Sequence, residues 1–224
     1  MIKSQEELRR SCPERKEQRK LHGLTEDGKY VSYKSAAKQR GVIFELTKEE
    51  FISFWKKSCE YCGSKIDTIG LDRIDNTKGY EITNIKACCK ICNYMKRDQT
   101  VTFFSNKITD IITHISKPLD KIHSNRSKKF SSYKYGANKR NLEFELSSEQ
   151  FKNITNHSCY YCGSIESIGI DRVDNNIGYL LENVVPCCKF CNLAKHKLST
   201  DEFISHVKKI HNHLKQGTND VRTN

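Results

Sequence analysis

The stretch that decides the fold is LDRIDNTKGYEITNIKACCKICN at 71–93, which recurs as IDRVDNNIGYLLENVVPCCKFCN at 170–192. A second matching pair precedes it, YKSAAKQRGVIFELTKEEF at 33–51 and YKYGANKRNLEFELSSEQF at 133–151. The two copies are offset by 100 residues in the earlier pair and by 99 in the later one, so the second copy lacks one residue of a loop between them. With only two copies and so long a period, the repeat predicts two tandem modules rather than a solenoid.

Each copy also carries two Cys-x-x-Cys pairs, one before the hairpin stretch and one at its end. Two such pairs are the ligand set of a closed structural zinc site, whose binding energy of roughly 10 kcal/mol would support a module with a thin core. We therefore predict two Zn²⁺ sites, held by Cys59, Cys62, Cys89 and Cys92 and by Cys159, Cys162, Cys188 and Cys191. Cys12, Cys88 and Cys187 are left over, and a Cys88-x3-Cys92 pair stays open as an alternative.

Local signals give each module the expected order helix, strand, helix, zinc knuckle, hairpin, knuckle, helix. Capping boxes at 47–50 and 147–150 predict helix starts, and the alternating residues 44–46 and 144–146 predict short strands. Phe51, Phe54 and Trp55, or Phe151 and Ile154, are expected in the core. The Asn76 to Gly79 loop predicts a β-hairpin, and a Ser199-x-x-Glu202 cap begins a last helix. The expected fold class is α+β.

Composition limits the domain plan. The chain has 224 residues, 36% of them hydrophobic, so one large apolar core is not expected. We expect a charged segment at 1–29, a first module at 30–115, a basic linker at 116–130, a second module at 131–214 and a tail at 215–224. Residues 116–140 hold 8 basic and 1 acidic side chains.

The overall charge indicates a polyanionic partner. Lys and Arg number 39 against 27 Asp and Glu, a formal charge of +12, which favours nucleic acid. No apolar run approaches the ~20 residues that a membrane span needs, and the N-terminus lacks the apolar region of a secretory signal. An intracellular protein, in cytoplasm or nucleus, without a membrane partner is expected.

The hairpin and second knuckle together resemble the zinc-containing HNH (ββα-metal) endonuclease family, particularly the forms common in phages and large DNA viruses. The resemblance covers most of both modules and implies a β-hairpin followed by a helix, with a divalent cation at their junction. It implies that Asp72 and Asp171 bind the metal from the strand, Asn93 and Asn192 bind it from the helix, and Asn84 and Asn183 orient the loop. Asp and Asn oxygens suit Mg²⁺ rather than zinc.

One departure from the family pattern concerns the general base. Arg73 and Arg172 stand where the family usually has His, and a guanidinium with a pKa above ~12 cannot accept a proton at neutral pH. These arginines could hold the scissile phosphate or stabilise transition-state charge, with Asp75, Asp174, Tyr80, Tyr179 or a metal-bound hydroxide supplying the nucleophile. Alternatively, the modules have lost the chemistry and kept the binding.

The sequence therefore predicts an HNH-like protein that binds DNA, most simply duplex DNA, and acts as a metal-dependent endonuclease. A catalytically inactive tandem module that only binds nucleic acid is the alternative, and a zinc-scaffolded protein-interaction module is a third class. Positive side chains expected at a phosphate backbone are Lys96, Arg97, Lys128, Lys129, Lys139, Arg140 and Lys195.

Overall fold

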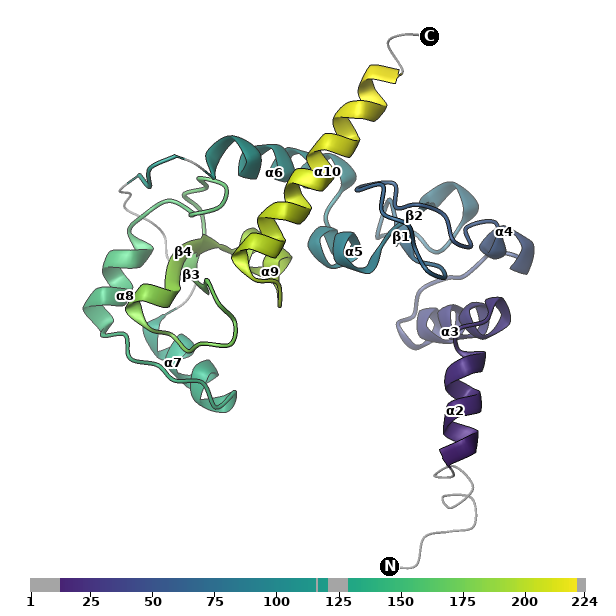
Figure 1. The fold of residues 1–224 in the computed structure, drawn as a ribbon, viewed down its shortest axis with the longest axis horizontal. Coiled ribbons are helices and arrows are strands. Elements are labelled where there is room, and N and C mark those ends of the chain that lie inside the picture. The colour runs from purple at the N-terminus through teal and green to yellow at the C-terminus, as the bar shows by residue number, and fades with distance from the viewer. Residues whose placement is uncertain (1–12, 116, 121–128, 221–224) are drawn as a thin grey trace, which may run out of the picture. The chain divides into compact units, whose positions relative to one another are not determined.

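The computed structural model describes residues 13–115, 117–120 and 129–220 (Figure 1). The chain divides into two compact units, Met1–Asn93 and Tyr94–Asn224. The fold is α+β, with a two-stranded antiparallel sheet in each unit among the residues described. Cys12, Lys128 and most of the expected linker lie outside the described residues. In the described part of the chain, no helix is both long and apolar enough to cross a membrane.

Between residues 13 and 93, the first unit contains three helices, a hairpin and the start of a fourth helix. Its elements are α2 (Pro13–His22), α3 (Glu26–Gln39), α4 (Lys48–Ile52), β1 (Leu71–Arg73), the 3-10 turn η1 (Ile82–Asn84), β2 (Ile85–Ala87) and the beginning of α5 (Lys90–Lys96). The pairing of β1 with β2 is antiparallel, with Asp72 opposite Lys86. The hairpin expected at this place is confirmed, and η1 lies in its connection.

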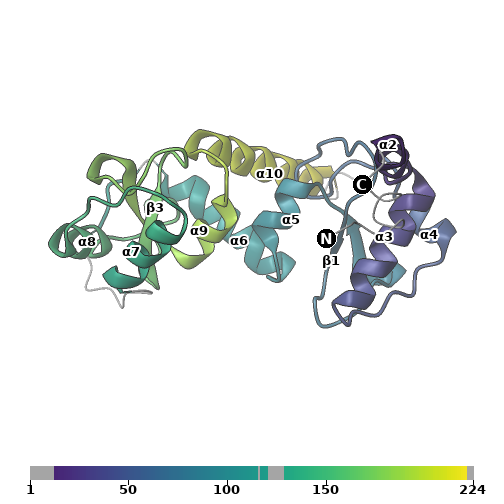
Figure 2. The same cartoon turned by 90° about the horizontal axis from the view of Figure 1, so that it is seen from below.

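The described part of the second unit repeats the order from α3 to α5, with one further helix before the repeat and one after it. Its elements are α6 (Val101–His114), α7 (Phe130–Lys139), α8 (Ser148–Thr155), β3 (Ile168–Arg172), the 3-10 turn η2 (Leu181–Asn183), β4 (Val184–Cys188), α9 (Lys189–Lys195) and α10 (Thr200–Asp220). Helices α8 and α9 both pack against the antiparallel pair of β3 and β4 (Figures 1 and 2).

Capping boxes begin the helices where the sequence predicts them. The Thr47 hydroxyl accepts a hydrogen bond from the Glu50 N–H at 3.1 Å, and the Glu50 carboxylate accepts one from the Thr47 N–H at 2.9 Å. Ser147 with Gln150 and Ser199 with Glu202 repeat this pattern. Helix α4 ends at Ile52, so Phe54 and Trp55 pack on the core from the turn that follows rather than from the helix.

The strands predicted at 44–46 and 144–146 are not formed as strands, which corrects the sequence expectation. Each is reduced to one parallel bridge, Phe44 with Tyr80 and Phe144 with Tyr179. The reason lies in the backbone: Tyr80 donates to the Ile43 carbonyl and accepts from the Glu45 N–H, and the chain then enters α4 after Thr47. On the partner side, the 3-10 turn η1 begins at Ile82 just after Tyr80, so little extended backbone is left there for a longer ladder.

Each unit has a small aromatic core of its own. In the first, Phe51 is fully buried, and Tyr30, Tyr33 and Phe44 surround it with edge-on or tilted rings 5.3–6.3 Å away. Phe151 has the same place in the second unit. The two cores also use equivalent positions of the repeat. These are Ala37, Leu46, Leu71, Tyr80 and Ile85 in the first core and Ala137, Leu146, Ile170, Tyr179 and Val184 in the second.

Helix α6 packs against α10 within the second unit. Each helix buries apolar side chains at spacings of four and three residues, which place them on one face. These residues are Phe104, Ile108 and Ile111 on α6 and Phe203, Val207 and Ile210 on α10. The sequence analysis places residues 101–115 in the first module. The module boundaries predicted from the sequence repeat remain predictions.

A glycine before the buried tyrosine lets the hairpin loop approach the neighbouring chain. A Cβ atom at Gly178 would lie 2.5 Å from the Glu143 carbonyl oxygen, and one at Gly79 would lie 2.5 Å from the Ile43 carbonyl oxygen. Both contacts are with backbone, which cannot rotate away. The bridges Phe144–Tyr179 and Phe44–Tyr80 therefore depend on these glycines.

We predict that Gly178→Ala lowers the stability of the second unit by about 1–3 kcal/mol, because the added methyl overpacks a backbone contact. Gly136→Ala is the matched control, since a Cβ there meets nothing closer than 3.9 Å and the position is inside helix α7. The control should be neutral or gain up to ~1 kcal/mol. Urea denaturation followed by circular dichroism measures both, and equal stability of the two variants would contradict the prediction.

Candidate functional site

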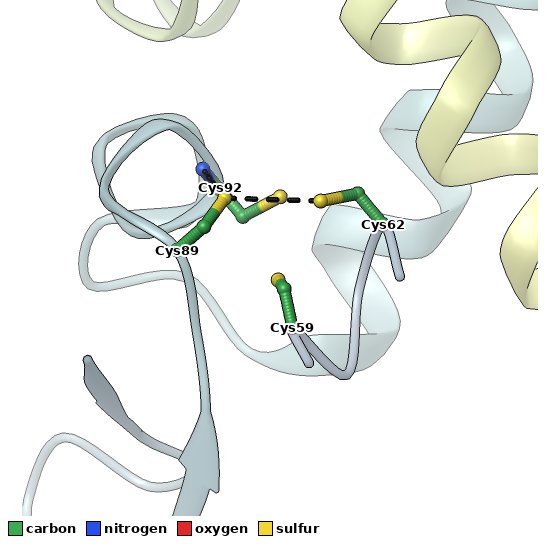
Figure 3. A group of neighbouring side chains, drawn as sticks. All are labelled: Cys59, Cys62, Cys89 and Cys92. Carbon is green, nitrogen blue, oxygen red and sulfur yellow. Dashed lines mark hydrogen bonds between the residues drawn. The ribbon is translucent and has the colours of Figure 1, made fainter. Parts of the chain in front are cut away.

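Four thiols converge in each unit. Cys59 and Cys62 come from the turn before the hairpin, whereas Cys89 and Cys92 come from the start of α5, and Figure 3 shows their sulfur atoms facing one another. The sulfur atoms of this group lie within 4.8 Å of one another, as do those of Cys159, Cys162, Cys188 and Cys191. Among the described residues, no other group of His, Cys, Asp and Glu side chains meets the geometry for a metal ion.

The sulfur spacing fits zinc. A tetrahedral ion with Zn–S distances of about 2.3 Å separates its sulfur ligands by about 3.8 Å. The Cys62 and Cys89 sulfur atoms are 3.7 Å apart, and so are those of Cys162 and Cys188. Seven of the eight thiols are buried and Cys89 is partly buried, so each group can form a closed structural site. The two four-cysteine sets predicted from the sequence are confirmed as groups able to hold zinc.

A fifth thiol lies beside each group without belonging to it. Cys88 and Cys187 are buried, and each donates toward the carbonyl of the following cysteine at 3.4 Å. The pKa of Cys59 lies far below the usual thiol range because Cys62, Cys88 and the other thiols donate hydrogen bonds to it. The same hydrogen bonds raise the pKa values of Cys88, Cys89 and Cys92. The alternative Cys88-x3-Cys92 pair is not the one that the geometry selects.

The middle asparagine of each hairpin holds the loop. Asn84 accepts a hydrogen bond from the Asp75 N–H at 2.9 Å and donates to the carbonyls of Asp75 and Gly79 at 3.0 and 2.9 Å. Asn183 makes the corresponding three bonds with Asp174 and Gly178 at 2.9, 3.0 and 2.9 Å. These are the backbone hydrogen bonds that the family resemblance implies for this position.

The arginine that follows the strand carboxylate also bonds to the loop. Nη1 of Arg172 donates to the carbonyls of Asn175 and Ile177, both at 2.7 Å, and its guanidinium lies 5.4 Å from the centre of the Tyr179 ring. Arg73 repeats this with Asn76, Lys78 and Tyr80. Both arginines thus close the loop around a buried tyrosine.

The strand carboxylates are buried and already have partners. Asp171 is 6% exposed, and its carboxylate accepts from the Tyr161 hydroxyl at 2.8 Å and from the Lys195 ammonium at 3.2 Å. Asp72 is 3% exposed and accepts from the Tyr61 hydroxyl at 2.6 Å. Burial raises the pKa of Asp171, against the opposing effect of Lys195. The helix asparagines donate from Nδ2 to strand carbonyls, Asn93 to Leu71 at 3.2 Å and Asn192 to Ile170 at 3.0 Å.

In the second unit, this arrangement does not fit a Mg²⁺ ion well. The Lys195 side chain is fully buried, and its ammonium also donates to the Arg172 carbonyl at 2.8 Å. The Lys195 ammonium therefore already neutralises Asp171, and it would repel a divalent cation bound to the same carboxylate.

The basic residues predicted at a phosphate backbone fall into two groups. Lys96 and Lys195 are 0% exposed, which is at odds with a surface contact to phosphate. Arg97, Lys129, Lys139 and Arg140 are exposed. Arg97 borders a hollow of about 360 Å³ in the second unit, next to Phe190 and Leu193, and the other three lie at the ends of α7.

Tyr61 and Tyr161 are site residues that the sequence reading missed. Each lies between the two cysteines of the first pair, is almost fully buried and binds the strand carboxylate. Burial raises the pKa of both tyrosines, which keeps the hydroxyl protonated as a donor. The signal was present, because both copies have Tyr at the same place in the Cys-x-x-Cys pair.

Comparisons with known proteins give two similarities and no family assignment. No family model matches the chain. Uncharacterized protein R423 of Acanthamoeba polyphaga mimivirus is 35% identical over 193 residues, covering 79% of this chain and 35% of that protein. The chain thus spans about a third of the length of the curated relative it matches. A structure of the rare-cutting HNH restriction endonuclease PacI aligns with 37% of this chain and 74% of its own, at 22% identity and a TM-score of 0.31.

The sulfur groups predict two zinc ions per chain. Cys62→Ser should leave one, because the first group loses a ligand while the second is independent of it; the first unit should then lose much of the roughly 10 kcal/mol that zinc contributes. Cys88→Ser is the control and should keep two ions. Elemental analysis of the purified proteins gives the count. Wild-type protein with fewer than two ions after purification with zinc present would contradict the assignment.

The buried ion pair predicts strong coupling between its partners. Lys195→Met should destabilise the second unit by about 3–5 kcal/mol, since it leaves a buried carboxylate without its cation. Adding Asp171→Asn should restore part of that loss, because the amide still accepts from Tyr161. A double-mutant cycle by chemical denaturation measures the coupling. Strictly additive changes in the free energy of unfolding would contradict an energetic coupling between Lys195 and Asp171.

Proposed function

We propose that this protein is a zinc-stabilised nucleic-acid-binding protein with two HNH-like modules that bind duplex DNA without cutting it. The observation that carries the proposal is the Lys195 ammonium, which lies on the Asp171 carboxylate and on the Arg172 carbonyl. A catalytic cation would need that carboxylate, and an internal cation already neutralises it.

The position of the general base supports the same conclusion. Arg73 and Arg172 cannot accept a proton at neutral pH, and each donates two hydrogen bonds to loop carbonyls. The nearby Asp75 is not a compensating base, since the Thr77 hydroxyl and N–H lower its pKa.

Support for binding comes from the charge and from where it is exposed. The chain carries a formal charge of +12. Helices α3 and α7 occupy equivalent places in the repeat, and both expose basic side chains near their C-terminal ends. These are Lys34, Lys38 and Arg40 on and after α3, and Lys134, Lys139 and Arg140 on and after α7. Equivalent basic surfaces in two copies suit a long polyanion better than a single small anion.

Support for the HNH-like class comes from the order of the elements. In each copy an antiparallel hairpin is followed directly by a short helix, β1–β2 by α5 and β3–β4 by α9. The helix asparagine reaches the strand that carries the carboxylate. This is the arrangement that the sequence resemblance implies, with zinc as the structural support of each hairpin and helix.

The proposal predicts salt-sensitive binding without cleavage. Affinity for a 30-bp duplex, measured by fluorescence anisotropy, should fall about 10³- to 10⁵-fold between 50 and 200 mM salt if roughly 6–10 phosphates are contacted. Supercoiled plasmid should stay intact with Mg²⁺ or Mn²⁺. The control is a chain carrying Asp72→Asn and Asp171→Asn, whose amide oxygens still accept from Tyr61 and Tyr161, assayed beside the wild type.

Two outcomes would overturn the proposal. Plasmid nicking that requires the added metal and disappears in the double variant would identify an adapted endonuclease. Absence of any salt-sensitive binding would instead favour a zinc-scaffolded module for protein interactions.

A further inference from the structure

Two arginines meet on one buried tyrosine in each module. In the second unit the guanidinium carbons of Arg140 and Arg172 lie 5.7 and 5.4 Å from the centre of the Tyr179 ring. We call these three residues the second arginine–tyrosine clamp. The first clamp, Arg40, Arg73 and Tyr80, has the corresponding distances of 5.9 and 5.5 Å.

The fold fixes both arginines of the second clamp before any ligand arrives. Arg140 follows α7 directly, and its Nε donates to the Gly136 carbonyl at 2.8 Å while its Nη2 donates to the Tyr179 hydroxyl at 3.0 Å. Arg172 is held by its two bonds to the hairpin loop. Because these side chains are already ordered, binding an anion costs them little rotamer entropy.

No carboxylate neutralises this pair of charges. Within the residues described, neither Arg140 nor Arg172 forms an ion pair, and Nη1 of Arg140 and Nε and Nη2 of Arg172 donate to no described atom. Glu143 and Glu145 follow Arg140 in the chain, but their side chains are hydrogen-bonded to each other, which raises the pKa of Glu145. Two guanidinium groups of like charge therefore lie at the Tyr179 ring with N–H donors available for a ligand. A bound anion would stabilise this arrangement.

We propose that the second arginine–tyrosine clamp binds one phosphate of a nucleic-acid backbone. This inference rests on the proposed function and names the groups that would carry it. Guanidinium groups match phosphate oxygens with paired N–H donors, and the tyrosine ring supports both cations without adding negative charge. The exposed lysines of the same helix, Lys134 and Lys139, lie next to the clamp along the chain and extend the positive surface. A polymer of phosphates can contact all of them together.

The test compares variants of equal charge. Arg140→Gln with Arg172→Gln should lower duplex affinity at 150 mM salt by about 5- to 50-fold and reduce the slope of log K against log salt by about 0.9, the value for one lost phosphate contact. The matched control is Lys208→Gln with Lys209→Gln, which removes the same charge from exposed positions of α10. That control should change the affinity less than threefold, because distant surface charge is screened.

Arg172 also holds the loop, so further variants separate binding from folding. Arg140→Gln alone keeps both hydrogen bonds of Arg172 to the hairpin loop. Tyr179→Phe keeps both positive charges but removes the hydroxyl that accepts from Arg140. Both should weaken DNA binding in the same direction while zinc content and melting temperature stay at wild-type values. Wild-type affinity in both variants would overturn the clamp.

The outcomes distinguish this inference from the proposed function. If wild-type protein does not bind DNA, the proposed function fails. If it binds DNA but the clamp variants match the Lys208 and Lys209 control, only the clamp fails. Vesicles containing phosphatidylserine test the other source of phosphate, and binding to them that depends on the clamp, with DNA affinity unchanged, would also overturn the assignment.

Discussion

The fold depends on eight thiols held in two groups of four. Where the structure describes the two units, each has a small apolar core and a two-stranded sheet, so few other contacts hold the first cysteine pair against the helix that follows the hairpin. A zinc ion held by each group would make that link with a few strong bonds rather than with a large buried area. The arrangement of hairpin, loop and helix that follows is consequently set by the positions of the sulfur atoms.

A second layer of buried polar contacts uses that arrangement. The tyrosine between the first two cysteines reaches the strand carboxylate, and in the second unit a buried lysine completes the group. In that unit, Asp171, Tyr161 and Lys195 together form a buried polar group inside the fold. The proposed binding without cleavage would leave this buried polar group, and the loop hydrogen bonds of Arg73 and Arg172, with a structural role.

Much of the fold can be predicted from the sequence because its signals are local. Capping boxes, the hairpin and the cysteine pairs depend on residues a few positions apart, and the structure has them at the expected places. The strand predicted at 44–46 fails because its length depends on how much partner backbone is available, which local alternation does not report. Lys195 looks like a surface lysine for a similar reason, since its partner Asp171 is 24 positions away and only the tertiary fold joins them. The two copies keep Lys at this place, and that repetition was the available sign of a buried role.

The duplication has a consequence for how long a partner stays attached. If both modules bind nucleic acid as proposed, a long ligand is held at two points, and release at one point leaves the other attached, so the first contact can reform before the ligand diffuses away. Dissociation then requires both contacts to be absent at once. Modest affinity in each copy is therefore sufficient for a long residence time, and the individual contacts remain weak enough to exchange along a repetitive ligand.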